Sequence, residues 1–403
     1  MTPARFRALW QTLLPIGQDP AGDGWLRYGW SEADLACRAW FTAQAQARGL
    51  QVTTDRNGNL YAWWGDPAGD GAVVTGSHFD SVPHGGAYDG PLGIVSGLLA
   101  VDLLAERGVT PHRPLAVAAF AEEEGSRFGV ACLGSRLLTG ALDPAAARKL
   151  TDPAGVSLAD AVSTAGLDPA ALGPEPELLA RWGYFIELHV EQGRALVDRG
   201  AAVGVASAIW PHGRWRIEIT GEGNHAGTTA MADRHDPMLT TAYTVLAANK
   251  EARLRGGHAT VGRIEVAPNA TNAVPARVTA WLDARAPDQQ TLTGLVEAVT
   301  VRAQDRADRD GTAVTVAAES VSPVVDFDVT LRDRLAARLG DAPVLPTGAG
   351  HDAGVLSGHV PTAMLFVRNP TGVSHAPGEH ATDDDCAAGV VALADVLAEL
   401  ACQ

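Results

Sequence analysis

Residues 72–108 read AVVTGSHFDSVPHGGAYDGPLGIVSGLLAVDLLAERG, and this stretch decides the fold class. It begins with a short apolar run of strand length, crosses a glycine-rich turn and continues into an amphipathic helix that ends at Gly108. Another apolar run of strand length, PLAVAAF, follows it. Short buried strands separated by helices are typical of a largely parallel sheet that is covered on both faces. The stretch therefore predicts an α/β domain.

A different pattern occupies residues 208–322. Its strands are expected in RWRIEIT, HATVGRIEVA, ARVTAWLDARA and TAVTVAAES, and its helices in DPMLTTAYTVLAANKEARLRG and QQTLTGLVEAVTVRAQDRADRDG. This order is β-α-β-β-α-β, the split βαβ pattern of a small two-layer module. We therefore predict a catalytic α/β domain with a mostly parallel central sheet over residues 1–207 and 323–403. An inserted α+β domain over residues 208–322 interrupts it.

The bulk composition limits the classes of partner. The chain has 403 residues, of which 46% are hydrophobic and 19% charged, as expected of a globular protein with a sizeable core. Its formal net charge of −16 argues against nucleic acid or an anionic membrane surface as a partner, since both favour basic proteins. The sequence contains no apolar stretch of membrane-spanning length, no signal-peptide pattern and no CxxC pair. We expect a cytoplasmic protein with reduced thiols.

Polar clusters follow four of the predicted strands. In an open parallel sheet, ligands bind at the carboxyl ends of the strands. Four separate segments are therefore expected to bring imidazole and carboxylate groups to one edge of the sheet, namely His78, Asp80, Asp89, Glu122, Glu123, Glu124, His189 and His375. Such a donor set without thiolates suits Zn²⁺, Mn²⁺, Co²⁺ or Ni²⁺.

Each of these residues also has a simpler explanation. A single histidine is more often a surface or satisfied core residue than a metal ligand. A run of glutamates is usually a solvated face, and aspartates among glycines are often turn residues. The run Glu122–Glu124, however, directly follows a buried strand and precedes Gly125. Because four independent strand ends carry the same chemistry, a metal site is favoured over four separate explanations.

Seven motifs, in this order, resemble those of the M20 metallopeptidase-like amidases. They are GSHFDSVPHGGAYDGPLG, EEEGSRFG, LHVEQG, GEGNHAGTTAM, PNATNAVPA, GAGHDA and GVSHAPGEH. The subgroup that the chain resembles contains N-carbamoyl-L-amino-acid hydrolases, β-ureidopropionases and allantoate amidohydrolases. His189 stands where peptidases of the superfamily usually carry a carboxylate, and in this it resembles the ureido-cleaving members. The resemblance implies a zinc-exopeptidase-like catalytic domain with an inserted lid or dimerisation domain.

The resemblance also implies two divalent metal ions per subunit, either Zn, Mn, Co or Ni. The implied ligands are His78, Asp89 and His189 for one ion, and Asp89, Glu124 and His375 for the other. Asp89 would therefore bridge the two ions. Asp80 would hold the His78 ring by its other nitrogen. Glycines between His78 and Asp89 would let the backbone fold tightly enough for both side chains to reach the ions.

Catalytic and substrate-binding roles follow from the same resemblance. Glu123 matches the general base, which takes a proton from water and passes it to the leaving nitrogen. His225 in NHAGTT matches a histidine that steadies the oxyanion and that a partner subunit supplies, which implies a homodimer. Arg285 matches a residue that binds the substrate carboxylate through its planar fork. The ordinary alternatives are a structural loop histidine for His225 and a solvated arginine for Arg285. Further substrate contacts are expected at Gln192, His212, Asn272, Gly350 and His351.

Together these features predict a metal-dependent amidohydrolase. It would cleave the linear ureido C–N bond of an N-carbamoyl-L-amino acid and release the amino acid, CO2 and ammonia. Allantoate is an alternative substrate, because it also presents a carboxylate beside a ureido group. An aminoacylase or peptidase, and a metal-free binding protein of the same fold, are further alternatives. Departures from the family pattern, such as Ala230 in place of a proline, leave the substrate preference undecided.

Overall fold

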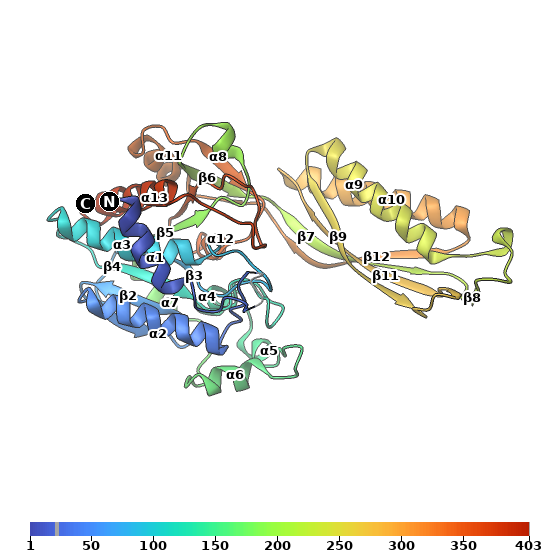
Figure 1. Cartoon of the computed structure of the whole chain (residues 1–403), viewed down its shortest axis with the longest axis horizontal. Coiled ribbons are helices and arrows are strands. Elements are labelled where there is room, and N and C mark those ends of the chain that lie inside the picture. The colour runs from blue at the N-terminus through green and yellow to red at the C-terminus, as the bar shows by residue number, and fades with distance from the viewer. Residues whose placement is uncertain (21–23, 403) are drawn as a thin grey trace. The chain divides into compact units, whose positions relative to one another are not determined.

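The computed structural model describes residues 1–20 and 24–402, and the chain divides into two compact units. The first unit comprises Met1–Ser207 and Asp326–Gln403, and the second comprises Ala208–Val325. Figure 1 shows their helices and strands in chain order. Within the described ranges, no helix is both long and apolar enough to cross a membrane.

A nine-stranded sheet forms the centre of the first unit. Its strands are β1 (Gln51–Thr54), β2 (Leu60–Trp64), β3 (Ala72–His78), β4 (Leu115–Phe120), β5 (Trp182–Val190), β6 (Val203–Ile209), β13 (Val325–Asp326), β14 (Val344–Thr347) and β15 (Thr362–Val367). The helices are α1 (Pro3–Leu13), α2 (Glu32–Ala47), α3 (Pro91–Glu106), α4 (Leu133–Thr139), α5 (Pro144–Ala147), α6 (Leu158–Thr164), α7 (Pro176–Leu179), α8 (Ala195–Asp198), α11 (Val329–Arg338), α12 (Asp352–Leu356) and α13 (Asp383–Ala401).

Four parallel strands lie next to one another in the middle of this sheet. The strand order is β1-β2-β4-β3-β5-β15-β6-β13, with β14 paired to β6, and β4, β3, β5 and β15 run parallel. After β3 the chain goes first to β4 on one side and later to β5 on the other. The strand order therefore reverses between β3 and β5, where open α/β sheets bind ligands. The predicted α/β class with a mostly parallel sheet is confirmed, and antiparallel strands that were not predicted extend it at both edges.

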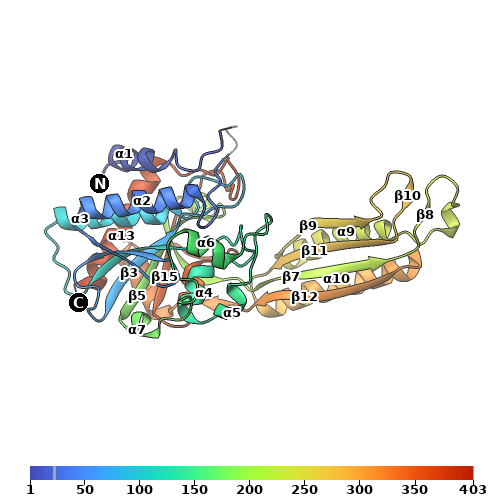
Figure 2. The same cartoon turned by 90° about the horizontal axis from the view of Figure 1, so that it is seen from below.

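Helix α3 connects the glycine-rich turn after β3 to the core. Pro91 occupies its first turn, where a missing backbone N–H costs nothing, and 13 of its 16 residues are buried. The sequence suggested an amphipathic helix, but α13 covers the face that would otherwise meet water (Figure 2). Leu98 and Leu104 are fully buried, and each such side chain stabilises the fold by about 1.5–3 kcal/mol. The start of α3 is therefore held firmly in place.

The second unit is a four-stranded antiparallel sheet with two helices packed against it. Its elements are β7 (His212–Thr220), β8 (Asn224–His225), a 3₁₀ turn (Met231–Asp233), α9 (Pro237–Arg255), β9 (His258–Ala267), β10 (Ala273–Val274), β11 (Arg277–Arg285), α10 (Gln289–Asp310) and β12 (Ala313–Ser322). The sheet order is β12-β7-β11-β9, and β8 pairs with β10 in a short ribbon. Trp215, Ile217 and Ile219 alternate along β7 and pack with the helices in one core. The predicted β-α-β-β-α-β order is confirmed, and the ribbon is an addition to it.

Candidate metal centre

The candidate centre gathers side chains at the carboxyl ends of the four central strands. His78 is the last residue of β3, and His189 is the last but one of β5. The other residues lie in the turns that follow, namely Asp89 before α3, Glu123 and Glu124 after β4, and His375 after β15. Strands distant in sequence are neighbours in the sheet, so the fold itself brings these six residues together.

Asp89 lies between two groups of candidate ligands and presents one carboxylate oxygen to each. Its Oδ1 is 3.2 Å from Nε2 of His189 and 3.5 Å from Nε2 of His78. Its Oδ2 is 3.3 Å from Nε2 of His375, which is 3.5 Å from the Glu124 carboxylate. Within each group the possible ligand atoms lie within 4.8 Å of one another. The two groups could therefore hold two metal ions bridged by Asp89.

The donor chemistry of these groups fits divalent cations. Oε1 of Glu124 is buried and, in the described part of the chain, has no hydrogen-bond partner, which costs free energy. Burial raises the pKa of Glu124 to about 7, and the nearby Asp89 carboxylate adds to the rise. Burial also opposes ionisation of Asp89, but His189 and the other two imidazoles hold its pKa well below the usual range. Cations here would stabilise carboxylates that burial otherwise disfavours, and imidazole with carboxylate suits transition metals.

A third group of possible ligands consists of Glu187, His189 and His351. Glu187, however, already accepts hydrogen bonds from Ser77 Oγ at 2.9 Å and from the Ala353 N–H at 3.0 Å. The His351 ring contacts the His189 ring edge-on, with 4.5 Å between centroids. Burial lowers the pKa of His351 well below its usual value, so the ring is neutral. These contacts favour a structural role for Glu187 and His351, packed beside His189, over a separate ion site.

Asp80 contacts both the His78 ring and the turn that follows β4. Nδ1 of His78 lies 2.9 Å from the backbone oxygen of Asp80, whereas the Asp80 carboxylate is 3.6 Å away. That carboxylate instead accepts the N–H groups of Glu123 and Glu124 at 3.0 and 2.9 Å. Asp80 therefore contacts the other nitrogen of the His78 ring through its backbone oxygen, while two backbone N–H groups occupy its carboxylate. Asp80 fixes the turn that carries Glu123 and Glu124.

Glu123 lies beside the two ligand groups without belonging to either. One oxygen, Oε2, is 3.6 Å from Nε2 of His78. The other, Oε1, accepts the Cys132 thiol at 3.4 Å. Burial raises the pKa of Glu123 well above its usual value, although His78 opposes the rise. A desolvated carboxylate next to candidate metal ligands is a strong candidate for proton transfer.

Glu122 belongs to the scaffold, although the sequence placed it with the ligands. Its carboxylate accepts the backbone N–H groups of Gly29, Arg127 and Phe128 at 2.9–3.0 Å. The residue has φ +53°, in the left-handed region, and its side chain contacts a different set of partners from those of Glu123 and Glu124. Three consecutive glutamates thus take different directions, which their identity alone does not reveal.

Glu379 and Gly90 shape the turn around Asp89, and neither was predicted as a site residue. Oε1 of Glu379 accepts the N–H groups of Tyr88 and Asp89, both at 2.9 Å. Gly90 has φ +84°, and a Cβ there would lie 2.5 Å from the His78 ring. Only glycine allows this conformation and this close approach together. The available signal was the glycine-rich turn itself and an acid in the segment GVSHAPGEH.

The predicted substrate contacts fall into two sets, one in each unit. In the first unit, Gln192 donates from Nε2 to Oδ2 of Asp89 at 2.7 Å. Gly350 is exposed and precedes the buried His351. In the second unit, His212 and Arg285 are register partners in the pairing of β7 with β11. Arg285 donates to the Asp283 carboxylate from Nε at 2.9 Å and from Nη2 at 3.3 Å.

The predicted catalytic residue His225 and the predicted substrate contact Asn272 lie at the other end of the second unit. The backbone oxygen of Asn272 accepts the N–H of Ala226 at 3.0 Å, next to the pairing of β8 with β10. Figure 2 shows this ribbon beyond one end of the sheet. His212 is the first of the nine residues of β7, and the ribbon follows the last of them. A strand of nine residues rises about 26 Å. His225 and Arg285 therefore lie far apart within one chain.

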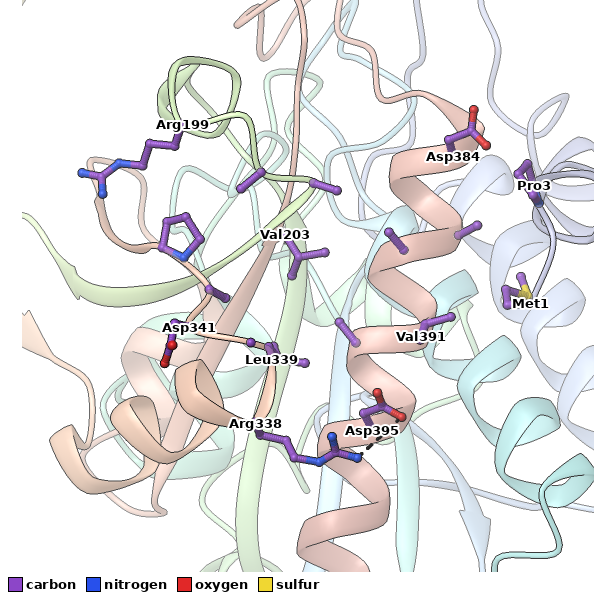
Figure 3. A pocket seen from close by; sticks show the side chains of 18 residues that line it. Met1, Pro3, Arg199, Val203, Arg338, Leu339, Asp341, Asp384, Val391 and Asp395 are labelled. Carbon is purple, nitrogen blue, oxygen red and sulfur yellow. Dashed lines mark ion pairs between the residues drawn. The ribbon is translucent and has the colours of Figure 1, made fainter.

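A cavity of about 980 Å³ lies elsewhere in the first unit, between α13, the turn after α11 and β6 (Figure 3). Val203, Leu339 and Val391 form part of its apolar lining, with Arg199 and Arg338 at its edge. None of the candidate metal ligands is among the described residues that line it. The cavity is therefore separate from the candidate centre.

Known proteins resemble the chain over almost its whole length. The family described as peptidase family M20/M25/M40 matches residues 74–399. An N-carbamoyl-L-amino acid amidohydrolase of Geobacillus stearothermophilus is 36% identical, over 98% of each chain. An allantoate amidohydrolase of Escherichia coli is 34% identical, over 99% of each. The crystal structure of a hydantoinase/carbamoylase family amidase from Burkholderia multivorans superposes with a TM-score of 0.87 at 30% identity, covering 100% of this chain and 98% of that one.

Substitution of the shared carboxylate should affect both ion sites. We expect Asp89→Asn to lose most of both metal ions and His375→Ala to bind about one ion per chain in place of about two, because only Asp89 faces both groups. Elemental analysis by mass spectrometry after dialysis measures this. His380→Ala, a neighbouring exposed histidine outside the groups, is the matched control. Equal metal loss in the Asp89 and His375 variants would contradict separate sites.

Metal binding should release protons. The hydrogen bond to Asp89 raises the pKa of His375 to about 9 against the effect of burial, so this ring is protonated at pH 7 in the metal-free protein. A cation must displace that proton, and metal affinity should therefore rise as the pH increases toward about 9. Calorimetric titration at pH 7 in two buffers of different ionisation enthalpy measures the release. Heats independent of the buffer would contradict it.

Proposed function

The chain belongs to peptidase family M20/M25/M40 and is a hydrolase, and from this premise we propose that it cleaves the linear ureido C–N bond of an N-carbamoyl-L-amino acid. The products would be the amino acid, CO2 and ammonia. The observation that carries the proposal is the buried Glu123 carboxylate beside two ligand groups that share Asp89. Allantoate is the second candidate substrate, because the Escherichia coli relative of that name is almost as similar as the carbamoyl-amino-acid relative.

In the proposed mechanism, Glu123 moves the proton. Two divalent cations bound by the ligand groups would lower the pKa of a water molecule and polarise the substrate carbonyl. Oε2 of Glu123 faces His78, while the Cys132 thiol occupies Oε1, so one defined oxygen is left to accept the proton of the attacking water. The same oxygen then delivers this proton to the leaving nitrogen. Zn, Mn, Co and Ni all suit the imidazole and carboxylate donor set. The proposed location of the protein is the cytoplasm.

Substrate orientation is assigned to side chains of the second unit. Arg285 is proposed to bind the substrate carboxylate through its planar fork, which the Asp283 carboxylate holds from one side. Burial lowers the pKa of the neighbouring His212, so that ring would contact the substrate in its neutral form. His225 is proposed to donate a hydrogen bond to the oxyanion, an interaction that is made in the transition state.

A homodimer is part of this proposal. His225 and Arg285 lie at opposite ends of the second unit, so one small substrate cannot touch both in a single chain. A second copy is therefore proposed to supply His225. Helix α9 presents an exposed apolar stripe at helical spacing, in which Leu246 is 70% and Leu254 66% exposed. Association of two chains would remove such a surface from water.

The reaction is tested by ammonia release from protein loaded with Mn²⁺. N-carbamoyl-L-methionine and allantoate are compared in parallel, with and without a chelator, and we expect chelator-sensitive turnover of the first. Turnover of allantoate alone would assign the second candidate. If neither substrate releases ammonia, but N-acetyl-amino acids or dipeptides release an amino acid, the protein would be an aminoacylase or peptidase instead.

Glu123→Gln is the control variant in the same assay. It should keep its metal and lose about 10²–10⁴-fold in turnover, because the amide cannot accept the proton. Retained metal without turnover separates loss of the base from loss of the centre. Near wild-type turnover would remove Glu123 as the base, and absence of metal from the wild-type protein would favour a binding protein of the same fold.

Mixing two impaired variants tests the contribution of the second chain. His225→Ala and Arg285→Ala should each be severely impaired at substrate concentrations below KM. In a mixed dimer, one site combines the intact Arg285 of one chain with the intact His225 of the other. After dissociation and reassociation in equal amounts, about a quarter of wild-type activity should therefore return. Arg309→Ala, an exposed arginine, replaces Arg285→Ala in the control mixture. No recovery in a mixture shown to contain mixed dimers would contradict the exchange of His225 between chains.

A further inference from the structure

The ring of His225 is held by its own turn. Nδ1 accepts the backbone N–H of Gly227 at 3.0 Å and that of Thr228 at 3.2 Å. A ring nitrogen that accepts two N–H groups carries no hydrogen, so the proton of the neutral ring lies on Nε2. Among the described residues, Nε2 has no hydrogen-bond partner. The turn therefore leaves His225 with one outward donor.

The backbone of the turn is wrapped closely around this ring. The carbonyl oxygen of His225 accepts the Thr229 hydroxyl at 2.7 Å and the Thr229 N–H at 3.2 Å. A Cβ at Gly227 would lie 3.2 Å from Cε1 of the ring, tighter than most Cβ contacts. The side-chain oxygen Oδ1 of Asn224 accepts the backbone N–H of His225 at 2.9 Å. These contacts fix the two donors at Nδ1, provided that the turn keeps its shape.

Arg234 closes the turn from outside. Its Nη2 donates to the carbonyl oxygens of Ala226 at 2.7 Å and Thr229 at 3.1 Å, and its Nε donates to Thr229 at 3.2 Å. The guanidinium thus joins the two carbonyls on either side of the N–H groups that face Nδ1. Its rigid planar fork can make these bonds at once, whereas a lysine ammonium lacks that geometry.

We propose that Arg234 is a positioning residue that locks the Nε2–H tautomer of His225. The inference rests on the proposed function, in which His225 donates to the oxyanion. A neutral histidine with its proton on Nδ1 would present a lone pair to that oxygen and repel it. By bracing the turn, Arg234 keeps Gly227 and Thr228 on Nδ1 and so keeps a donor on Nε2. The donor is then preorganised before substrate arrives, as oxyanion stabilisation requires.

Histidine nitrogen NMR of the full-length protein tests the lock directly. The chain has 12 histidines, and the signals that disappear in His225→Ala identify this ring. The wild-type ring should show a hydrogen-free Nδ1 and a protonated Nε2. In Arg234→Ala and Arg234→Lys the two tautomers should mix, because the turn loses its brace. Persistence of the wild-type pattern in both variants would overturn the proposal, whatever happens to activity.

Kinetics show whether the lock serves catalysis. Arg234→Ala should lower kcat about 10- to 100-fold with little change in KM, since the lost interaction is made in the transition state. Added guanidinium should partly restore both kcat and the NMR pattern, which a merely misfolded variant would not allow. Arg309→Ala is the matched control and should be unaffected. A raised KM at unchanged kcat, or no rescue in a folded variant, would contradict the positioning role.

A third variant guards against loss of folding and separates this proposal from the proposed function. Gly227→Ala disturbs the same ring without removing a charge and should mix the tautomers in the same way. If it leaves them unchanged, the lock does not depend on the turn and the proposal is wrong. Full turnover of His225→Ala would instead remove the oxyanion role of His225, while the NMR result for Arg234 would stand.

Discussion

The arrangement of the first unit depends on one buried carboxylate that faces two clusters of ligands. Asp89 offers one oxygen to His189 and His78 and the other to His375. Burial would neutralise an isolated aspartate at this depth, so its charge requires positive partners on both sides. The surrounding contacts follow from this need. Glu379 holds the Asp89 backbone, Gly90 lets the His78 ring approach, and α3 anchors the turn in the core.

The sequence was informative wherever a residue's role follows from its place at the end of a strand. His78 and His189 end parallel strands, and the alternation of strands with helices sufficed to predict a mostly parallel sheet and the inserted β-α-β-β-α-β unit. It failed where direction is set by local backbone conformation. Glu122, at φ +53°, contacts the scaffold, while Glu123 and Glu124 contact the candidate centre. The face of α3 that α13 covers was likewise invisible, because burial by a segment almost 300 residues later leaves no local pattern.

Contacts made by backbone atoms are the second class of feature that residue identity does not encode. The sequence does not say which atoms of Asp80 make its contacts: its carbonyl oxygen contacts His78, and its carboxylate accepts hydrogen bonds from the turn after β4. The same holds in the second unit, where two N–H groups decide which nitrogen of His225 is free. In both places the sequence gives the residue type, but the backbone of the surrounding turn determines which of its atoms donate or accept hydrogen bonds.

The separation of the ligands along the chain has a thermodynamic consequence. His78 and His375 lie almost 300 residues apart, so metal ions would join the first and last strands of the parallel core. An ion that binds only the folded chain adds about 2.7 kcal/mol to the free energy of unfolding at a concentration 100 times its dissociation constant. If the two groups bind metal ions, the melting temperature of this protein would therefore depend on the free metal concentration around it. Scarcity of metal would then lower the free energy of unfolding of the chain as well as the activity proposed for its centre.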